Sequence, residues 1–93
     1  MSLNERIEAI VSGRVQGVSF RSFTVSKASE LGLKGYVKNL PDRTVEVVAE
    51  GSKEKINELI SWLRKGPLLS KINEVKISCS EVLNEFSDFR IKY

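Results

Sequence analysis

The sequence contains no histidine and only one cysteine among its 93 residues. The lack of histidine excludes Ser–His and Cys–His nucleophile pairs, acid–base catalysis by histidine and most zinc sites. The single cysteine, Cys79, excludes an intrachain disulfide, and we expect it to be a small core residue on the apolar face of a strand. Any chemistry must therefore come from Arg, Lys, Asp, Glu or Asn side chains, from backbone amides or from the substrate itself.

The sequence also lacks any apolar run near the length of a membrane span, and its polar opening at residues 1–6 does not resemble a signal peptide. The hydrophobic fraction of 41% and the charged fraction of 29% are ordinary for a soluble globular protein. The formal charge of +3 favours small anionic ligands but does not require nucleic acid as a partner. We therefore expect one domain spanning residues 1–93, located in the cytoplasm and without a membrane partner.

Alternation of apolar and polar residues predicts five strands, at residues 5–12, 35–40, 44–51, 75–79 and 89–93. Two stretches with helical spacing lie between them. The first begins at Phe20 and ends at Gly32, where a C-terminal cap belongs; the second begins after the N-cap Ser52 and ends at Gly66. This order is typical of a ferredoxin-like α+β sandwich (βαββαβ), in which two helices cover one face of a mostly antiparallel sheet.

The two predicted helices each carry one apolar stripe. We expect the first to bury the side formed by five residues, Phe20, Phe23, Thr24, Ala28 and Leu31. The second has its stripe at Ile56, Leu59, Ile60 and Leu63. Trp62 lies off this stripe, and we interpret it as partly packed at the rim of the core.

The segment GRVQGVSFR, residues 13–21, connects the first strand to the first helix. Its two glycines, Gly13 and Gly17, allow a tight turn and leave backbone N–H groups uncovered. A loop that leads into a helix N-terminus collects unpaired donors and the positive end of the helix dipole at one point. Arg21 adds a planar, permanently charged group that suits phosphoryl oxygens. These residues predict a cradle for a small anion, although the pattern is neither a dinucleotide-binding nor a Walker motif.

A second candidate residue, Asn39, lies near the end of the second strand. Because a helix connects the first two strands, they run parallel and their C-terminal ends lie at the same edge of the sheet. We therefore expect Arg21 and Asn39 to converge beside the loop amides. Without this convergence, Arg21 would more often be a structural ion-pair partner and Asn39 a turn former.

The motif at residues 13–21, followed by GYVKN at residues 35–39, resembles the acylphosphatase family over almost the whole chain. The resemblance implies one acylphosphatase-like domain that cleaves a carboxyl–phosphate anhydride with water, giving a carboxylate and inorganic phosphate. It implies that Arg21 binds the phosphate and that Asn39 orients the water. It also implies an anion cradle formed by the backbone amides of Val15, Gln16, Gly17, Val18, Ser19 and Phe20.

One position departs from the pattern of this family. Arg43 stands in the turn between the second and third strands, where a glycine commonly follows the aspartate. A residue other than glycine resists a positive φ, which leaves the geometry and local stability of this turn open. The departure does not touch Arg21 or Asn39. Ser19 lies at a position that varies in the family, so the resemblance gives its side chain no role.

The expected reaction makes few demands on the protein, because an acyl phosphate has a good leaving group. Holding the phosphoryl oxygens, stabilising the transition-state charge and aligning water are sufficient. We therefore expect no cofactor and no metal ion. The expected partners are an acyl phosphate as substrate and inorganic phosphate as product and inhibitor, and the expected oligomeric state is a monomer.

Two alternatives share the predicted architecture. An RNA-recognition domain stacks bases on aromatic residues of its central strands, but residues 7–11 and 44–50 contain none, and Glu46 and Glu50 would repel phosphates. A non-catalytic domain that binds an acyl phosphate or carbamoyl phosphate is the other alternative. Phosphate release and the absence of RNA binding would distinguish the three.

Overall fold

The computed structural model describes residues 3–67 and 69–93. Met1 and Ser2, which belong to the polar opening of the chain, and Leu68 lie outside the described residues. The elements are β1 (Asn4–Arg14), α1 (Phe20–Glu30), β2 (Lys34–Asn39), β3 (Val45–Ser52), α2 (Lys53–Lys65), β4 (Lys71–Ser80) and β5 (Phe89–Ile91). All the expected elements are present in the expected order, with β1 and β4 longer than the alternation predicted.

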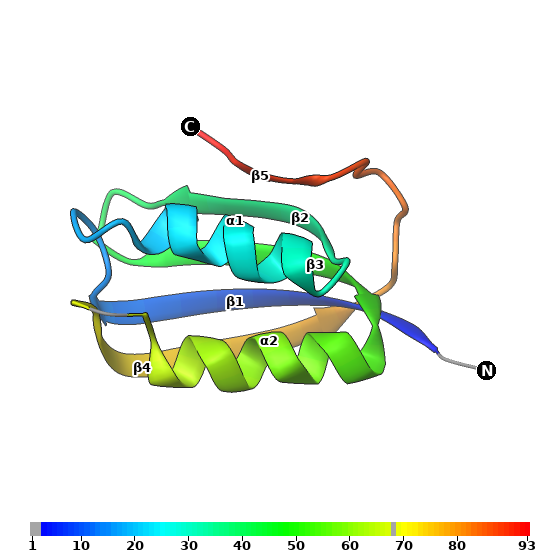
Figure 1. Cartoon of the computed structure of the whole chain (residues 1–93), viewed down its shortest axis with the longest axis horizontal. Coiled ribbons are helices and arrows are strands. Elements are labelled where there is room, and N and C mark those ends of the chain that lie inside the picture. The colour runs from blue at the N-terminus through cyan, green and yellow to red at the C-terminus, as the bar shows by residue number, and fades with distance from the viewer. Residues whose placement is uncertain (1–2, 68) are drawn as a thin grey trace.

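The strands form one sheet in the order β4-β1-β3-β2-β5. Pairing is antiparallel except between β2 and β5. Since β1 and β2 both pair antiparallel with β3, they run parallel to each other, as their helical connection requires. Figure 1 shows α1 and α2 side by side over one face of the sheet. This is the ferredoxin-like α+β fold expected from the sequence. Neither helix in the described part of the chain is long and apolar enough to span a membrane.

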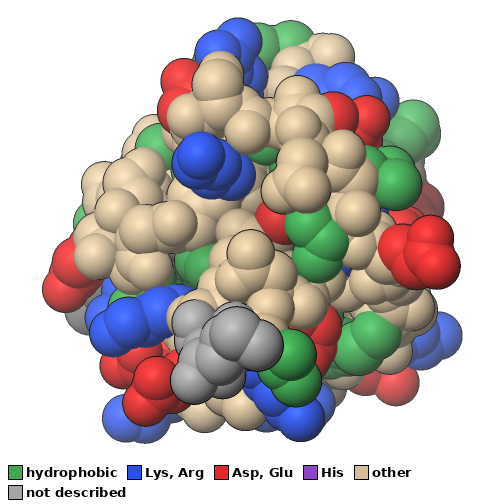
Figure 2. All heavy atoms as spheres, turned by 90° about the vertical axis from the view of Figure 1, so that its right-hand side faces the viewer, with side chains coloured by type: hydrophobic (Ala, Val, Ile, Leu, Met, Phe, Trp, Pro, Cys, Tyr) green, Lys and Arg blue, Asp and Glu red, His purple; other side chains and the backbone are tan. Residues whose placement is uncertain are grey.

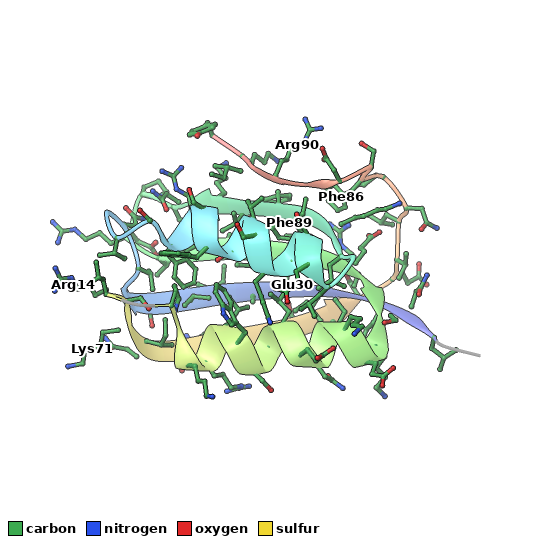
Figure 3. All side chains as sticks on the ribbon, in the orientation of Figure 1. Arg14, Glu30, Lys71, Phe86, Phe89 and Arg90 are labelled. Carbon is green, nitrogen blue, oxygen red and sulfur yellow. The ribbon has the colours of Figure 1, made fainter. Side chains whose placement is uncertain are left out.

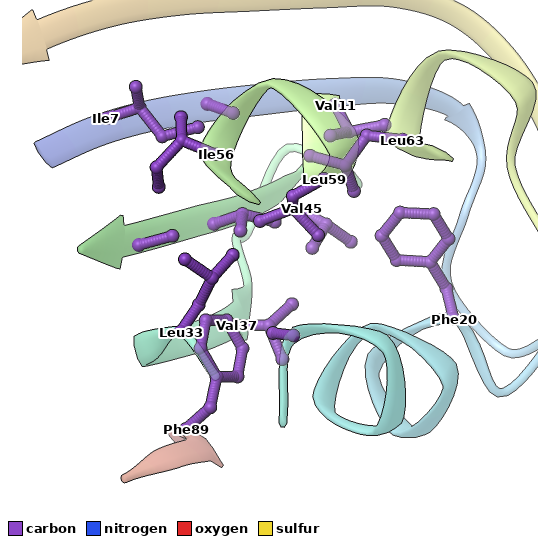
Figure 4. Packing of buried hydrophobic residues seen from close by; sticks show 14 of the residues in the cluster. Ile7, Val11, Phe20, Leu33, Val37, Val45, Ile56, Leu59, Leu63 and Phe89 are labelled. Atoms are coloured by element: carbon purple, nitrogen blue, oxygen red, sulfur yellow. The ribbon is translucent and has the colours of Figure 1, made fainter. Parts of the chain in front are cut away.

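The core lies between the helices and the sheet. Val11, Val45 and Val37, from three neighbouring strands, are fully buried under the helices, together with Leu59 and Leu63 of α2. Figure 4 shows these side chains in one layer. Phe20, the first residue of α1, points its ring into this layer, and the ring lies 6.3 Å from that of the half-buried Trp62. Trp62 therefore packs at the rim of the core, as expected.

The stripe expected on α1 is narrower than the sequence suggests. Phe20, Thr24 and Ala28 are buried, but Phe23 is 44% exposed, so its assignment to the core was wrong. The buried residues follow the single row i, i+4, i+8 because this helix packs mainly along β2 and β5. The buried Thr24 hydroxyl is satisfied because it donates a hydrogen bond to the carbonyl oxygen of Phe20 at 2.8 Å.

The prediction that Cys79 is a core residue was also wrong, because its side chain is exposed. Cys79 pairs with Ile7, so it does lie on the sheet face that carries the helices. It belongs, however, to β4, an edge strand, so it has a neighbouring strand on one side only. Its Sγ lies 3.7 Å from Oε1 of Glu5 on the neighbouring strand.

The predicted helix boundaries correspond to defined caps. Gly32, with φ of 71°, ends α1, and the amide of Leu33 bonds to the carbonyl of Ala28 at 2.9 Å, which together make a Schellman motif. Ser52 caps α2 through a hydrogen bond that its Oγ accepts from the amide of Lys55 at 3.3 Å. Gly66, with φ of 76°, ends α2. These caps explain why the sequence located both helices well.

The segment from residue 81 to residue 88 crosses from β4 at one edge of the sheet to β5 at the other. Glu50 holds this segment, because its carboxylate accepts hydrogen bonds from the amides of Leu83 and Asn84 at 3.0 and 3.1 Å. The same carboxylate pairs with Arg6 at 2.8 Å. The crossing places β5 beside β2 and α1 (Figure 1). The C-terminal residues that follow β5 therefore reach the edge at which β1 and β2 end, where the candidate site lies.

Figure 2 shows the end of the molecule opposite to that edge. Acidic and basic side chains alternate over it, and hydrophobic side chains appear in small separate groups. Where described residues form this surface, it therefore presents neither a field of one charge nor a continuous apolar patch.

Candidate active site

The sheet places the end of β1 and Asn39 at the same edge. Val11 of β1 and Asn39 of β2 are both register partners of Val45, which lies between them on β3. The loop of residues 15–19 leaves β1 at this edge, and the turn of residues 40–44 leaves β2 there. In Figure 1 the two loops lie together at the left-hand end of the molecule. The loop and Asn39 therefore lie at the same edge, as the connectivity predicted.

Gly13 redirects the chain from β1 into the loop. The pairing of β1 with β4 changes register between Ser12 and Gly13, and Gly13 has φ of 125°. A Cβ atom at this position would clash with the carbonyl oxygen of Lys71 in β4. Only glycine fits this close approach of two backbones.

The loop is anchored by its two apolar ends and leaves its amides free. The side chains of Val15 and Phe20 are buried, each with 1% exposure. Between them Gly17 and Ser19 adopt positive φ values of 74° and 61°. Ser19 occupies the N-cap position of α1, but its side chain makes no capping hydrogen bond. No backbone carbonyl in the described part of the chain accepts a hydrogen bond from the amides of residues 15–20. These six donors at a helix N-terminus are available to an anion.

Arg21 is the second residue of α1 and lies beside these amides. Within residues 3–67 and 69–93 no carboxylate lies within ion-pair distance of Arg21, and the first turn of α1 contains no acidic residue. Its guanidinium instead lies 5.4 Å from the centre of the Tyr93 ring. The absence of a partner argues against a structural ion pair, the more common role of a half-buried arginine.

A hollow of about 310 Å³ lies over the loop and the start of α1. It is lined by Val15, Gly17, Ser19, Phe20, Arg21, Ser22, Ile91 and Tyr93. The loop and Arg21 thus form one wall, and the end of the chain forms the other. Its volume is at the lower end of the range for small-molecule sites, about 300–1,000 Å³.

A larger hollow of about 560 Å³ lies beside β5, at Tyr36 and Phe86. One of its two cations, Arg90, is neutralised by Asp88 at 3.0 Å. We place the candidate site in the smaller hollow, because among the described residues its loop amides have no carbonyl partner and its arginine has no carboxylate partner.

Asn39 is partly buried beneath this edge and does not line the hollow. Its Oδ1 atom is buried and has no hydrogen-bond partner among the described residues. An unpaired buried acceptor costs about 1–3 kcal/mol, so such atoms are rare in folded proteins. A water molecule that donates a hydrogen bond to Oδ1 would remove this cost. This is the property required of a water-orienting residue.

The side chain of Gln16 makes contacts that the sequence did not reveal. Its Nε2 donates hydrogen bonds to the carbonyl oxygens of Leu40 and Thr44, at 3.0 and 2.9 Å. The resemblance had assigned only the backbone amide of Gln16. The one signal available in the sequence was an uncharged amide side chain in the middle of the loop, and such a signal does not identify its partners.

Arg43 adopts the left-handed conformation that the family pattern requires at its position, with φ of 73°. The turn is closed by hydrogen bonds from the amide of Leu40 to the carbonyl of Thr44 and from the amide of Arg43 to the carbonyl of Leu40, at 2.9 and 3.2 Å. Asp42 accepts hydrogen bonds from the hydroxyl and the amide of Thr44, which lower the pKa of its carboxyl group. The turn keeps its geometry, and the strain is confined to one residue.

Two further cations lie at the same end of the molecule as the site. Arg14 and Lys71 are register partners at the ends of β1 and β4, and both are exposed. Figure 3 shows them projecting outward at the end of the molecule that carries the loop. Exposed charges act over about 10 Å at ordinary ionic strength, so they raise the local positive potential without forming a defined contact.

Comparisons with known proteins agree with the motifs. The acylphosphatase family profile matches residues 7–91. An acylphosphatase of Methylococcus capsulatus is 45% identical over 87 residues, which cover 94% of this chain and 95% of the relative. The crystal structure of an acylphosphatase from Bacillus subtilis superposes with a TM-score of 0.92 and 35% identity, over 96% of this chain and 99% of that one.

The same fold also occurs inside a larger protein. Full-length HypF matches all of this chain with a TM-score of 0.90 and 31% identity, but the match spans only 12% of HypF. The Methylococcus and Bacillus proteins, in contrast, are matched over nearly their whole length. The resemblance seen in the motifs, and with it the expected hydrolase activity on acyl phosphates, is confirmed: the chain belongs to the acylphosphatase family.

Proposed function

We propose that this chain hydrolyses acyl phosphates by direct attack of water on phosphorus, with defined roles for three groups. The backbone amides of Val15, Gln16, Gly17, Val18, Ser19 and Phe20 hold the phosphoryl oxygens. Arg21 binds the same oxygens and stabilises their charge in the transition state. Asn39 orients the attacking water. The observation that carries the proposal is a set of loop amides without a carbonyl partner beside an arginine without a carboxylate partner, both among the residues that the structure describes.

The loop and Arg21 suit the phosphoryl group because both present hydrogen-bond donors to it. A phosphoryl group passes through a transition state with its charge spread over three oxygens, so fixed donors around it lower the barrier. Hydrogen bonds to charged groups contribute about 1.5–3 kcal/mol each in net terms. Arg21 therefore contributes to both binding and rate.

Asn39 suits the water because its amide group binds hydrogen-bond donors and acceptors but does not titrate. The water oxygen forms the new bond to phosphorus, and the bond between phosphorus and the acyl oxygen breaks. The electron pair of that bond leaves with the carboxylate. One proton of the water stays on the attacking oxygen and the other passes to a phosphoryl oxygen, so the products are a carboxylate and dihydrogen phosphate, which then exchanges its protons with the solvent. No histidine is needed, which agrees with the composition of the chain.

The family supplies an acyl phosphate as substrate and inorganic phosphate as product. We further propose that the chain acts as a single domain over residues 1–93, as a cytoplasmic monomer without a nucleic-acid partner. The composition of the central strands supports the last point, because β1 and β3 contain no aromatic residue and β3 carries Glu46. Glu50 adds less repulsion than the sequence suggested, since its carboxylate is paired with Arg6.

The direct test is the release of phosphate from benzoyl phosphate by the wild-type protein, with and without EDTA. We expect rapid turnover that EDTA does not reduce, inhibited by inorganic phosphate. Loss of turnover in EDTA would contradict the metal-free mechanism. Absence of turnover by a folded protein that still binds phosphate would favour the alternative, a non-catalytic binding domain. The match to one part of the larger protein HypF is the reason to test this alternative.

A further inference from the structure

Gln16 connects the two halves of the candidate site through its side chain. It lies in the middle of the loop that supplies the amides, and its carboxamide reaches across to the turn of residues 40–44. Each of its two N–H groups has its own acceptor: the carbonyl oxygen of Leu40 at 3.0 Å and that of Thr44 at 2.9 Å. Both hydrogen bonds are partly buried, which shields them from competition with water.

The two carbonyl groups that Gln16 binds are those that close the turn. The oxygen of Leu40 already accepts a hydrogen bond from the amide of Arg43, and the oxygen of Thr44 accepts one from the amide of Leu40. A carbonyl oxygen has two lone pairs. Gln16 therefore uses the second lone pair on each oxygen, and its hydrogen bonds add to those that close the turn.

The contact matters for the site because Leu40 directly follows Asn39. Among the described residues, no other side chain of the loop at 15–19 forms a hydrogen bond with the turn. The backbone of Asn39 is therefore connected to the cradle by the sheet on one side and by this contact on the other. The sheet fixes the backbone of Asn39 at Val45, and Gln16 fixes the adjoining turn against the loop.

We propose that Gln16 is a positioning residue, whose side chain holds the end of β2 against the amide cradle and thereby sets Asn39 relative to the bound phosphoryl group. The inference rests on the proposed role of Asn39. The water must lie in line with the bond that breaks, and a displacement of about 1 Å can cost about a hundredfold in rate. The phosphate, in contrast, is held by backbone amides and Arg21, which the Gln16 side chain does not contact.

The test replaces Gln16 by methionine, which has a similar length and shape but no donor. We expect Gln16→Met to lower kcat by about tenfold to a hundredfold, while the inhibition constant of inorganic phosphate changes by less than about threefold. Gln16→Asn is the second variant. It keeps a polar amide in the loop but is one methylene too short to reach both carbonyls. It should therefore also lower kcat and leave the inhibition constant of phosphate nearly unchanged.

The control is Ser52→Ala, which removes the cap of α2 far from the site. It should lower the thermal stability and leave kcat and the inhibition constant of phosphate unchanged. The comparison therefore distinguishes a displaced Asn39 from a general loss of stability. A parallel loss of kcat and phosphate binding in the Gln16 variants would overturn the proposal, because the side chain would then shape the cradle itself. Wild-type kcat in both variants would overturn it as well.

A second readout does not depend on turnover. In ¹H–¹⁵N NMR spectra, the side-chain amide signals of Asn39 and the backbone signals of Leu40 and Thr44 should shift in Gln16→Met and not in Ser52→Ala. Unchanged Asn39 signals would contradict the proposal. If the wild-type protein failed to hydrolyse benzoyl phosphate, the proposed function would fail, and these spectra would still decide whether Gln16 positions Asn39.

Discussion

The guanidinium of Arg21 lies 5.4 Å from the centre of the Tyr93 ring, and the two side chains line the same hollow. Arg21 comes from the start of α1 and Tyr93 follows β5, so the contact joins segments far apart in the sequence. Among the described residues, the Arg21 guanidinium makes this contact with an aromatic ring and forms no ion pair. The aromatic ring attracts the cation without neutralising it, so the charge stays available to an anion.

Tyr93→Ala should weaken phosphate binding by leaving Arg21 free to change conformation. A cation–π contact at an exposed site contributes about 0.5–1 kcal/mol, which corresponds to an increase of about two- to fivefold in the inhibition constant of phosphate. Tyr93→Phe keeps the ring and should behave like the wild-type protein. The measurement is phosphate inhibition of benzoyl phosphate hydrolysis, and equal constants for the Ala and Phe variants would show that the ring does not support Arg21.

Glu50→Gln should destabilise the fold, because it leaves Arg6 without its buried partner. The side chains of Glu50 and Arg6 are only 6% and 11% exposed, and breaking a buried pair costs about 3 kcal/mol. Glu8 also lies within 4.0 Å of Arg6 but is 45% exposed, so Glu8→Gln should cost less than about 1 kcal/mol. Urea denaturation measures both changes. Similar losses for the two variants would contradict this account of the pair.

The same carboxylate predicts how stability depends on pH. Burial raises the pKa of Glu50, but hydrogen bonds from the amides of Leu83 and Asn84 and from Arg6 outweigh this effect, so its pKa is lowered from 4.5. The folded state therefore favours the ionised form. The resulting stabilisation is complete above pH 4.5 and is lost as the pH falls through the lower, folded-state pKa. The free energy of unfolding should decrease below pH 4.5 more steeply in the wild-type protein than in Glu50→Gln.

Arg43→Gly should stabilise the protein by relieving the left-handed conformation of this residue. A residue other than glycine pays about 1–2 kcal/mol for positive φ, part of which is offset by the greater freedom of glycine in the unfolded chain. We expect a net gain of about 0.5–1 kcal/mol in the free energy of unfolding. Arg43→Ala removes the charge but keeps the strain, and a gain of the same size in this variant would assign the effect to charge instead.

The sequence predicted the parts of this structure that depend on local pattern and on topology. Gly32 and Ser52 identified the helix boundaries because their caps involve residues only a few positions away. The common edge of the loop and Asn39 followed from the parallel course of β1 and β2. In both cases the physical rule acts on the backbone and does not need the packing of side chains.

The predictions that failed concerned burial, and what the sequence left unpredicted concerned contacts between distant segments and the backbone of one turn. Phe23 and Cys79 lie on elements that were correctly predicted, but their exposure depends on how far the neighbouring elements extend. The hydrogen bonds of Gln16 join residues 24 and 28 positions apart, and they require a particular rotamer and spacing of two loops. The φ of Arg43 depends on a balance between local strain and closure of the hairpin. None of these can be obtained from spacing along the chain.

The measurement that tests the central claim most directly compares Arg21→Ala and Asn39→Ala with the wild-type protein, in both turnover of benzoyl phosphate and inhibition by phosphate. We expect Arg21→Ala to lose turnover and phosphate inhibition together, because it removes the charge that holds the phosphoryl group. Asn39→Ala should lose kcat but bind phosphate as the wild-type protein does. Tight phosphate inhibition in Arg21→Ala, or turnover near the wild-type rate in Asn39→Ala, would contradict the account.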